Sequence, residues 1–171
     1  KAFKKELIVE LHGDWKEGPF LSKKRKLAFL ERKITPFLAK KSLRTADKIR
    51  GVSNNLIKEA EEIAPGKKYF LLQTFTDLDD FLNERNARSD NFILFVGRAQ
   101  KVKGAEYLIE AFSRLEKDFP DFRLVLVGEG MPEGKLSLEE TKNKMRNCYC
   151  LVVPSLSEGL PRVLLEAMAL G

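Results

Sequence analysis

The chain has 171 residues, of which 43% are hydrophobic and 33% are charged, so it can form an apolar core. Its longest apolar segments, FILFV and LVLV, fall far below the roughly 20 residues of a membrane-spanning helix, and its two cysteines cannot build a disulfide framework. The net charge of +6 favours anionic partners.

The first half of the chain alternates short β-rich segments with helical patterns, which is typical of parallel sheets with crossover helices. We expect strands in LIVELHG, KIRGV and KYFLL. The first strand ends in a loop that holds His12, the single histidine of the chain. Ser53 is the expected N-cap of the helix NNLIKEAEEIA, which Pro65 and Gly66 end.

A basic amphipathic segment lies between the first two strands. Residues 22–44 read SKKRKLAFLERKITPFLAKKSLR and form a long helical pattern that Pro36 is expected to kink or split. Five apolar residues recur at helical spacing among the basic ones: Leu27, Leu30, Ile34, Phe37 and Leu38. This face either packs on a sheet or docks on anionic lipid, and the pattern alone is compatible with both.

The second half repeats the alternation after a polar segment without a period, residues 77–91, which we interpret as a linker. Expected strands are FILFV, FRLVLV and YCLVVPS; expected helices are AEYLIEAFSRLEKDF, SLEETKNKMRN with Ser137 as cap, and residues 160–170 with Pro161 in the first turn. Because one short helix separates the last two strands, the sheet is either small or lacks a strand. Strand periodicity places Cys148 and Cys150 on one face, and we expect two buried residues in a reducing cytoplasm.

Unusual polar residues of the second half follow its strands, at the carboxyl edge where open parallel sheets bind ligands. The residues after the three strands are Gly97, Arg98, Lys103 and Gly104; Gly128, Glu129 and Gly130; and Pro154, Ser155, Ser157, Glu158 and Gly159. A guanidinium and an ammonium beside a helix start can receive a phosphate, although a solvated basic loop has the same composition. The segment VGEGMPEG does not fit a dinucleotide fingerprint, because Pro132 and Gly134 oppose an immediate helix.

Three further residues each allow a local and a functional interpretation. Glu166 lies on an otherwise apolar helix, where it either pairs with Arg162 four residues earlier or serves a ligand. Glu158 either stabilises a helix N-terminus or holds a ligand hydroxyl. His12 is either structural or close to a ligand.

The motifs Gly97-Arg98 with Lys103-Gly104, RLVLVGEG and PSLSEGLPRVLLEAMALG resemble, in the same order, the carboxy-terminal domain of the retaining glycosyltransferases of family four, the glycosyl transferases group 1. LHGDW, ADKIRGVSNNL and TDLDDF resemble the end of that family's amino-terminal domain and the connection between domains. The resemblance implies an α/β protein of the GT-B fold, with two Rossmann-like parallel-sheet domains facing a cleft, both represented only in part. Residues 1–76 then belong to the acceptor-side domain, 77–91 to the linker and 92–171 to the nucleotide-sugar domain.

The resemblance also implies residue roles. Arg98 and Lys103 neutralise the donor diphosphate, and Glu166 accepts hydrogen bonds from the ribose. Glu158 either holds the hydroxyls of the donor sugar or lies close to the reacting centre. His12 contacts that sugar from the other domain. The implied catalytic residues are His12, Arg98, Lys103 and Glu158; the implied donor-binding residues are Gly97, Arg98, Lys103, Gly128, Glu158, Gly159, Leu160 and Glu166. No metal or other cofactor is implied beyond a UDP-, GDP- or ADP-sugar as substrate.

The implied activity is transfer of a sugar, with retention of configuration, to a glycan, a lipid-linked sugar or a small metabolite. We expect a cytoplasmic protein with a peripheral contact at the inner face of the membrane and no nucleic-acid partner. The segment between Gly130 and Cys148 lacks a helix and a strand that the family has, and both chain ends suggest an incomplete protein that would itself be inactive. A non-catalytic nucleotide-binding module, a phosphorylase or epimerase of the same fold, and a lipid-surface protein are the alternatives.

Overall fold

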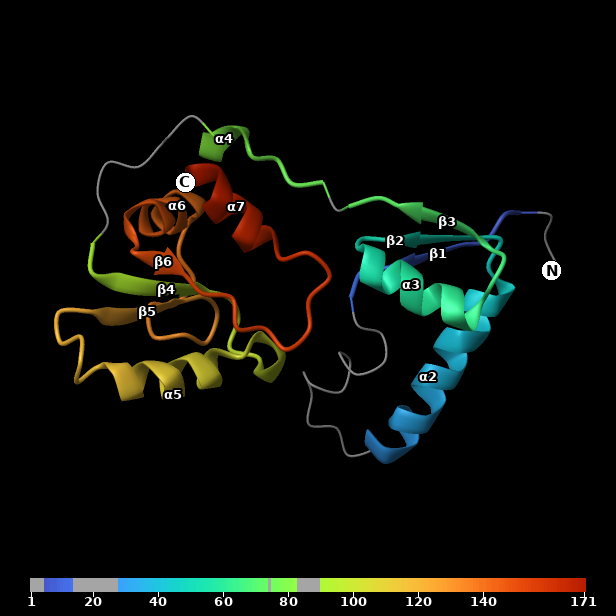
Figure 1. The fold of residues 1–171 in the computed structure, drawn as a ribbon, viewed down its shortest axis with the longest axis horizontal. Helices are drawn as coiled ribbons and strands as arrows, with labels where there is room; N and C mark the ends of the chain where they lie inside the picture. Colours follow the sequence, from blue (N-terminus) through green and yellow to red (C-terminus); the bar gives the residue numbers. More distant parts are fainter. Residues whose placement is uncertain (1–4, 14–27, 74, 83–89) are drawn as a thin grey trace. The chain divides into compact units, whose positions relative to one another are not determined.

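The computed structural model of the protein describes residues 5–13, 28–73, 75–82 and 90–171 (Figure 1). The chain forms two compact units. The first contains the residues up to 75 together with the loop segment 157–160, and the second contains 76–156 and 161–171. Among the described residues, no helix combines the length and the apolar character needed to cross a bilayer.

The first unit is built on a three-stranded parallel sheet in the order β1-β2-β3. The strands are β1 (Ile8–Leu11), β2 (Lys48–Gly51) and β3 (Lys68–Leu71), and the crossover helices are α2 (Ala28–Thr45) and α3 (Asn54–Ile63). Ile49 at the centre of the sheet is fully buried and belongs to the same apolar cluster as Leu43 of α2 and Leu56 and Ala60 of α3. The expected strands and helices of this half are therefore present.

Local sequence signals set the helix boundaries in the first unit. The Ser53 hydroxyl accepts a hydrogen bond from the Leu56 amide at 3.5 Å, so the predicted N-cap of α3 is confirmed. Helix α2 continues through Pro36 as one element, so the helix is not split there. Its apolar residues divide: Leu43 is buried, whereas Ile34, Phe37 and Leu38 are exposed. The prediction that this face packs on the sheet is therefore wrong for these three side chains. Leu27 and the side chain of Leu30 lie outside the described part of the protein.

The second unit has a three-stranded parallel sheet in the order β5-β4-β6, covered by helices on both faces (Figure 1). Its elements are α4 (Asp79–Leu82), β4 (Phe92–Val96), the 3₁₀ turn η1 (Lys101–Lys103), α5 (Ala105–Leu115), β5 (Arg123–Val127), α6 (Leu138–Asn147), β6 (Cys150–Leu151) and α7 (Arg162–Leu170). Successive residues of β4 face opposite sides: Phe95 packs with Leu108 of α5, and Leu94 packs with Met145 of α6 and Leu170 of α7. The described residues of this unit therefore form a small sheet, and the two alternatives given for it stay open.

The second unit differs from expectation at three places. Strand β6 covers only two residues, which pair with β4, and the Val152 amide donates one further hydrogen bond to the Leu94 carbonyl at 2.8 Å. Cys148 is buried as predicted, but it ends α6, and Cys150 is exposed, so the prediction of two buried cysteines on one strand face is wrong. Helix α7 begins at Arg162 with Pro161 as its cap, two positions later than expected.

The residues predicted to form the linker include a helical turn. Helix α4 buries Phe81 in the core of the second unit. The buried Lys142 of α6 holds this turn, because its Nζ donates to the Asp80 carbonyl at 3.2 Å and lies 3.2 Å from the Glu139 carboxylate. Residues 83–89 of the linker lie outside the described part of the protein.

Candidate functional site

Three loops of the second unit meet at the carboxyl edge of its sheet. The Ala99 amide of the loop after β4 donates to the Glu129 carbonyl after β5 at 2.9 Å. The Leu156 amide after β6 donates to the Val102 carbonyl of η1 at 2.8 Å. Main-chain hydrogen bonds therefore join the three loops, and the convergence expected from parallel strands is present.

Glycines allow these loops to approach one another closely. Gly128 has φ 140°, and a Cβ at this position would lie 2.0 Å from the Gly97 carbonyl oxygen. Gly104 has φ 69°, and a Cβ there would lie 2.1 Å from the Pro154 carbonyl oxygen. Both contacts are main chain against main chain, so a larger residue at Gly104 or Gly128 has to separate two loops.

The two predicted cationic residues lie on the loop after β4. Arg98 is exposed, and Lys103 is half-buried at the end of η1. Gly104 closes η1 and serves as the N-cap of the eleven-residue helix α5. The N-terminus of α5 therefore follows Lys103 directly, and an anion at this position would meet amide N–H groups as well as a positive side chain.

Glu166 lies in the middle of α7 with only 17% of its side chain exposed. Its Oε1 is 3.9 Å from an Arg162 guanidinium nitrogen, and that arginine is 65% exposed. The local ion pair considered for Glu166 is thus present, but it is long and its partner is solvated, so it stabilises the helix by little. An ion pair of this kind can form between fully exposed side chains, so it does not explain why the Glu166 side chain is only 17% exposed.

Glu158, Gly159 and Leu160 belong to the first unit. A Cβ at Gly159 would lie 2.2 Å from the His12 carbonyl oxygen and 2.8 Å from Cγ2 of Val52, so this glycine allows the loop segment to contact the end of β1. Glu158 is exposed. The predicted site residues His12, Glu158 and Gly159 are therefore brought together in the first unit, and Gly97, Arg98, Lys103, Gly128 and Glu166 are held in the second.

Two residues beside His12 were missed by the sequence analysis. Oε2 of Glu10 is 2.9 Å from Nε2 of His12, and Oε1 of Glu10 accepts from the Arg50 guanidinium at 2.9 Å. Arg50 is in turn held by its Nε, which donates to the Leu72 carbonyl at 3.2 Å. The hydrogen bond from Arg50, followed by that from His12, lowers the pKa of the Glu10 carboxyl below its ordinary value. The available signal for Glu10 was its spacing, because residues two apart on a strand share a face.

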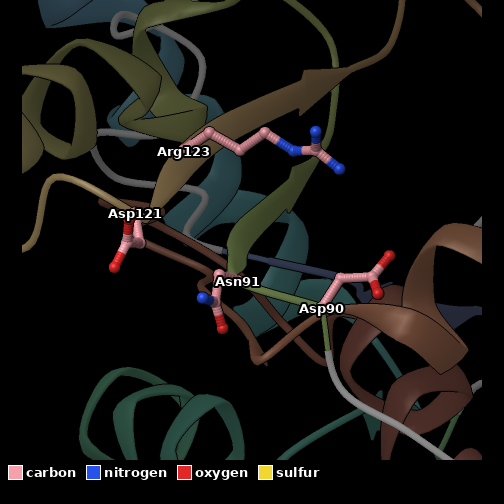
Figure 2. Close-up of a pocket in the computed structure, with 4 residues that line it drawn as sticks. All are labelled: Asp90, Asn91, Asp121 and Arg123. Carbon is pink, nitrogen blue, oxygen red and sulfur yellow. The ribbon is translucent and has the colours of Figure 1, made fainter.

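A hollow lies elsewhere on the second unit. It has a volume of about 480 Å³ and is lined by Asp90, Asn91, Asp121 and Arg123, at the amino-terminal ends of β4 and β5. The four side chains point in different directions (Figure 2), and the guanidinium carbon of Arg123 lies 5.4 Å from the centre of the Phe92 ring. We place the functional site at the carboxyl edge instead, because loops and glycines converge there.

The described residues contain no group of three or more His, Cys, Asp or Glu side chains that could hold a metal ion. Positive charge at the carboxyl edge comes from Arg98 and from the Lys101 and Lys103 side chains of η1. The site can therefore neutralise an anionic group with its own cations.

Solved structures with this architecture identify the fold of the chain. Sucrose-phosphate synthase from Thermosynechococcus elongatus superposes with a TM-score of 0.75 at 20% identity, over 99% of this chain and 49% of that one. A variant of S. aureus TarM in complex with fondaparinux, alpha-GlcNAc-glycerol and UDP gives a TM-score of 0.70 at 11% identity, over 96% of this chain and 35% of that one. These similarities show the fold, and the chain is an α/β protein with the GT-B fold.

Sequence similarity relates the second half of the chain to a known family. Residues 90–171 match the family model of the glycosyl transferases group 1. An uncharacterised glycosyltransferase of Methanocaldococcus jannaschii is 33% identical in an alignment of 106 positions that covers 50% of this chain and 26% of the relative. The chain spans between 26% and 33% of the curated relatives it matches.

Proposed function

We propose that the protein transfers a sugar from a nucleoside-diphosphate donor to an acceptor hydroxyl, with retention of configuration at the anomeric carbon. The observation that carries this proposal is the set of three loops, joined through their main chains, that presents Arg98 and Lys103 at the start of α5. The match of residues 90–171 to the glycosyl transferases group 1 supports it. The UDP in the TarM complex, a nucleoside diphosphate bound by a protein of the same fold, agrees with it.

In the proposed reaction, the bond between the anomeric carbon and the diphosphate oxygen breaks, and the acceptor oxygen bonds to that carbon on the same face. The leaving diphosphate takes the acceptor proton. Arg98 and Lys103 stabilise the negative charge that develops on the diphosphate, so the step is driven by charge stabilisation from residues already in position. No metal ion is assigned to this step, and the cations of the loop supply the positive charge.

The remaining residues bind the donor in this proposal. Glu166 accepts hydrogen bonds from the ribose hydroxyls, which gives its half-buried carboxylate a partner better than Arg162 at 3.9 Å. Glu158 and the amides of Gly159 and Leu160 hold the sugar or the phosphate. His12 contacts the sugar through Nδ1, because Nε2 is engaged by Glu10. Gly97 and Gly128 allow the loops after β4 and β5 to approach each other closely at the site.

The free thiols of Cys148 and Cys150 agree with a reducing compartment, and we propose that the reaction takes place in the cytoplasm. The acceptor is a hydroxyl of a glycan, a lipid-linked sugar or a small metabolite in this proposal. Acceptor screening is therefore a separate experiment from donor binding.

Calorimetric titration of the full-length protein with UDP, GDP and ADP tests the donor site. We expect one nucleotide to bind, and Glu166→Gln to weaken that binding by roughly 10- to 100-fold, the usual loss for hydrogen bonds to a charged group. Glu110→Gln is the matched control, because Glu110 forms an ion pair with Arg114 at the same four-residue spacing on α5. Equal binding by the Glu166 variant, or an equal loss in Arg162→Gln, would show that Glu166 only pairs with Arg162.

Turnover distinguishes an enzyme from a binding module. We expect Lys103→Ala to lower kcat by about 10²- to 10³-fold, as for other groups that stabilise a developing anion. Near-normal turnover of this variant contradicts the role of Lys103. Nucleotide binding without transfer, or consumption of inorganic phosphate, contradicts the transferase assignment itself.

A further inference from the structure

Helix α2 of the first unit has a second apolar face that points away from its core. Leu43 is 1% exposed and packs in the unit's apolar cluster. Ile34 lies nine residues earlier, which places it about 180° around the helix from Leu43 at 3.6 residues per turn. Ile34, Phe37 and Leu38 are 44%, 66% and 53% exposed. Three adjacent apolar side chains on one helix face form a patch, whereas single exposed apolar residues are ordinary.

This patch, defined as Ile34, Phe37 and Leu38, lies in the most basic segment of the chain. Residues 22–44 contain nine lysines and arginines and one glutamate, a net charge of +8, whereas the whole chain carries +6. Lys40 and Lys41 are exposed in the helical turn that follows Phe37 and Leu38. The apolar patch is therefore bordered by cations.

We propose that the outer face of α2 docks on an anionic lipid bilayer. In this arrangement the helix lies parallel to the surface, with Phe37 and its apolar neighbours at the boundary between headgroups and acyl chains. Lys40 and Lys41 contact the lipid phosphates. The contact is peripheral, since α2 is not apolar enough to span the membrane.

The combination of apolar and basic side chains distinguishes a bilayer from other partners. A second copy of the chain on this face would bring Lys40 and Lys41 of the two molecules together, and the like charges would repel. A nucleic acid would neutralise the lysines but leave Ile34 and Leu38 in water. An anionic bilayer offers negative headgroups and an apolar layer within the reach of one helix face.

Co-sedimentation of the full-length protein with lipid vesicles tests the proposal. We expect binding to vesicles of phosphatidylcholine with one third phosphatidylglycerol, and little binding to phosphatidylcholine alone or in high salt. The double variant Phe37→Ser and Leu38→Ser should lower the partition coefficient by roughly tenfold or more. Its control is Leu115→Ser with Phe119→Ser, an aliphatic and aromatic pair in the second unit with exposures of 46% and 54%.

A second pair of variants tests the basic residues. Lys40→Ala with Lys41→Ala should lower partitioning by about fivefold for each lysine, the usual contribution of a cation at an anionic surface. Lys58→Ala with Lys68→Ala removes the same charge from exposed positions of the same unit and should have a much smaller effect. Equal losses in the two double variants would show general attraction of a basic protein, not docking through α2.

Other outcomes overturn the proposal outright. These are no binding to the anionic vesicles, unchanged binding of the Phe37 and Leu38 variant, or a loss of self-association in that variant without vesicle binding, measured by light scattering. Circular dichroism confirms that each variant is folded. Nucleotide titration should be unchanged, because Arg98, Lys103 and Glu166 lie in the other unit, so failure of lipid docking is distinguishable from failure of the proposed donor site.

Discussion

Replacement of Gly104 by alanine tests whether main-chain contact between loops holds the functional edge together. Gly104 and Gly134 have nearly the same positive φ, 69° and 67°. A Cβ at Gly104 would lie 2.1 Å from the Pro154 carbonyl oxygen, whereas a Cβ at Gly134 would meet nothing within 4 Å. Gly134→Ala is therefore a control that carries the conformational penalty without the collision.

The expected losses of stability follow from the conformational penalty and from the collision with Pro154. The left-handed conformation costs an alanine about 1 kcal/mol, which is the whole expected effect of Gly134→Ala. Gly104→Ala adds a displacement of packed main chain, for which overpacking costs of about 1–3 kcal/mol are usual, so we expect about 2–4 kcal/mol in total. The separation of the two loops should also weaken nucleotide binding in the Gly104 variant but not in the Gly134 variant.

Urea unfolding followed by circular dichroism measures the two free energies of unfolding, and calorimetry measures nucleotide affinity. Equal destabilisation by the two substitutions would refute the reasoning, because the contact with Pro154 would then contribute nothing. A destabilised Gly104 variant with unchanged nucleotide affinity would show that the contact supports the fold and not the site.

Three further predictions follow from single contacts. The pKa of Glu10 in the folded protein is lowered, chiefly by Arg50. The stability that this contact contributes is therefore present above the ordinary glutamate pKa and is lost as the pH falls through the lowered pKa. In a carbon-detected NMR titration, Arg50→Met should raise the pKa of Glu10 towards its ordinary value. Maleimide should label Cys150 in the native protein and Cys148 only after unfolding, because Cys148 is buried; equal native labelling rates would contradict the burial. Lys142→Met should destabilise the second unit by about 1–3 kcal/mol, because it removes the hydrogen bond to the Asp80 carbonyl of α4. Hydrogen exchange should increase most in α4. Unchanged exchange in α4 would show that the lysine does not hold this turn.

The sequence predicted elements whose cause is local. Ser53 and Ser137 were recognised as helix caps because a hydroxyl before a periodic segment satisfies the amides of the first turn, and both caps are present. Helix α4 was missed, since a single turn has no period of its own and is stabilised by burial of Phe81 in a distant core. The exposure of Cys150 was missed for a similar reason, because it depends on which strands and helices cover β6.

In the candidate site, too, the features with a local cause were predicted and those that depend on distant residues were not. The grouping of the Arg98, Lys103 and Gly128 loops follows from strand direction alone, because the carboxyl ends of parallel strands share one edge. The contact of Glu10 with Arg50 joins residues 40 positions apart and depends on the pairing register of β1 with β2. No pattern in a single sequence reports that register, so the support around His12 became visible only in the folded chain.

The glycine contacts at the rim of the second unit have a consequence for how this protein can evolve. Because Gly97 meets Gly128 and Gly104 meets Pro154 through main chain, the spacing of the loops does not depend on the side chains that the loops carry. Intervening positions such as Ala99 and Gln100 are then open to substitution without loss of the frame, whereas the glycines are not. A library of variants over residues 97–104 should therefore show intolerant glycines, loss of the proposed transfer at Arg98 and Lys103, and permissive positions elsewhere, and new ligand preferences should arise at the permissive positions.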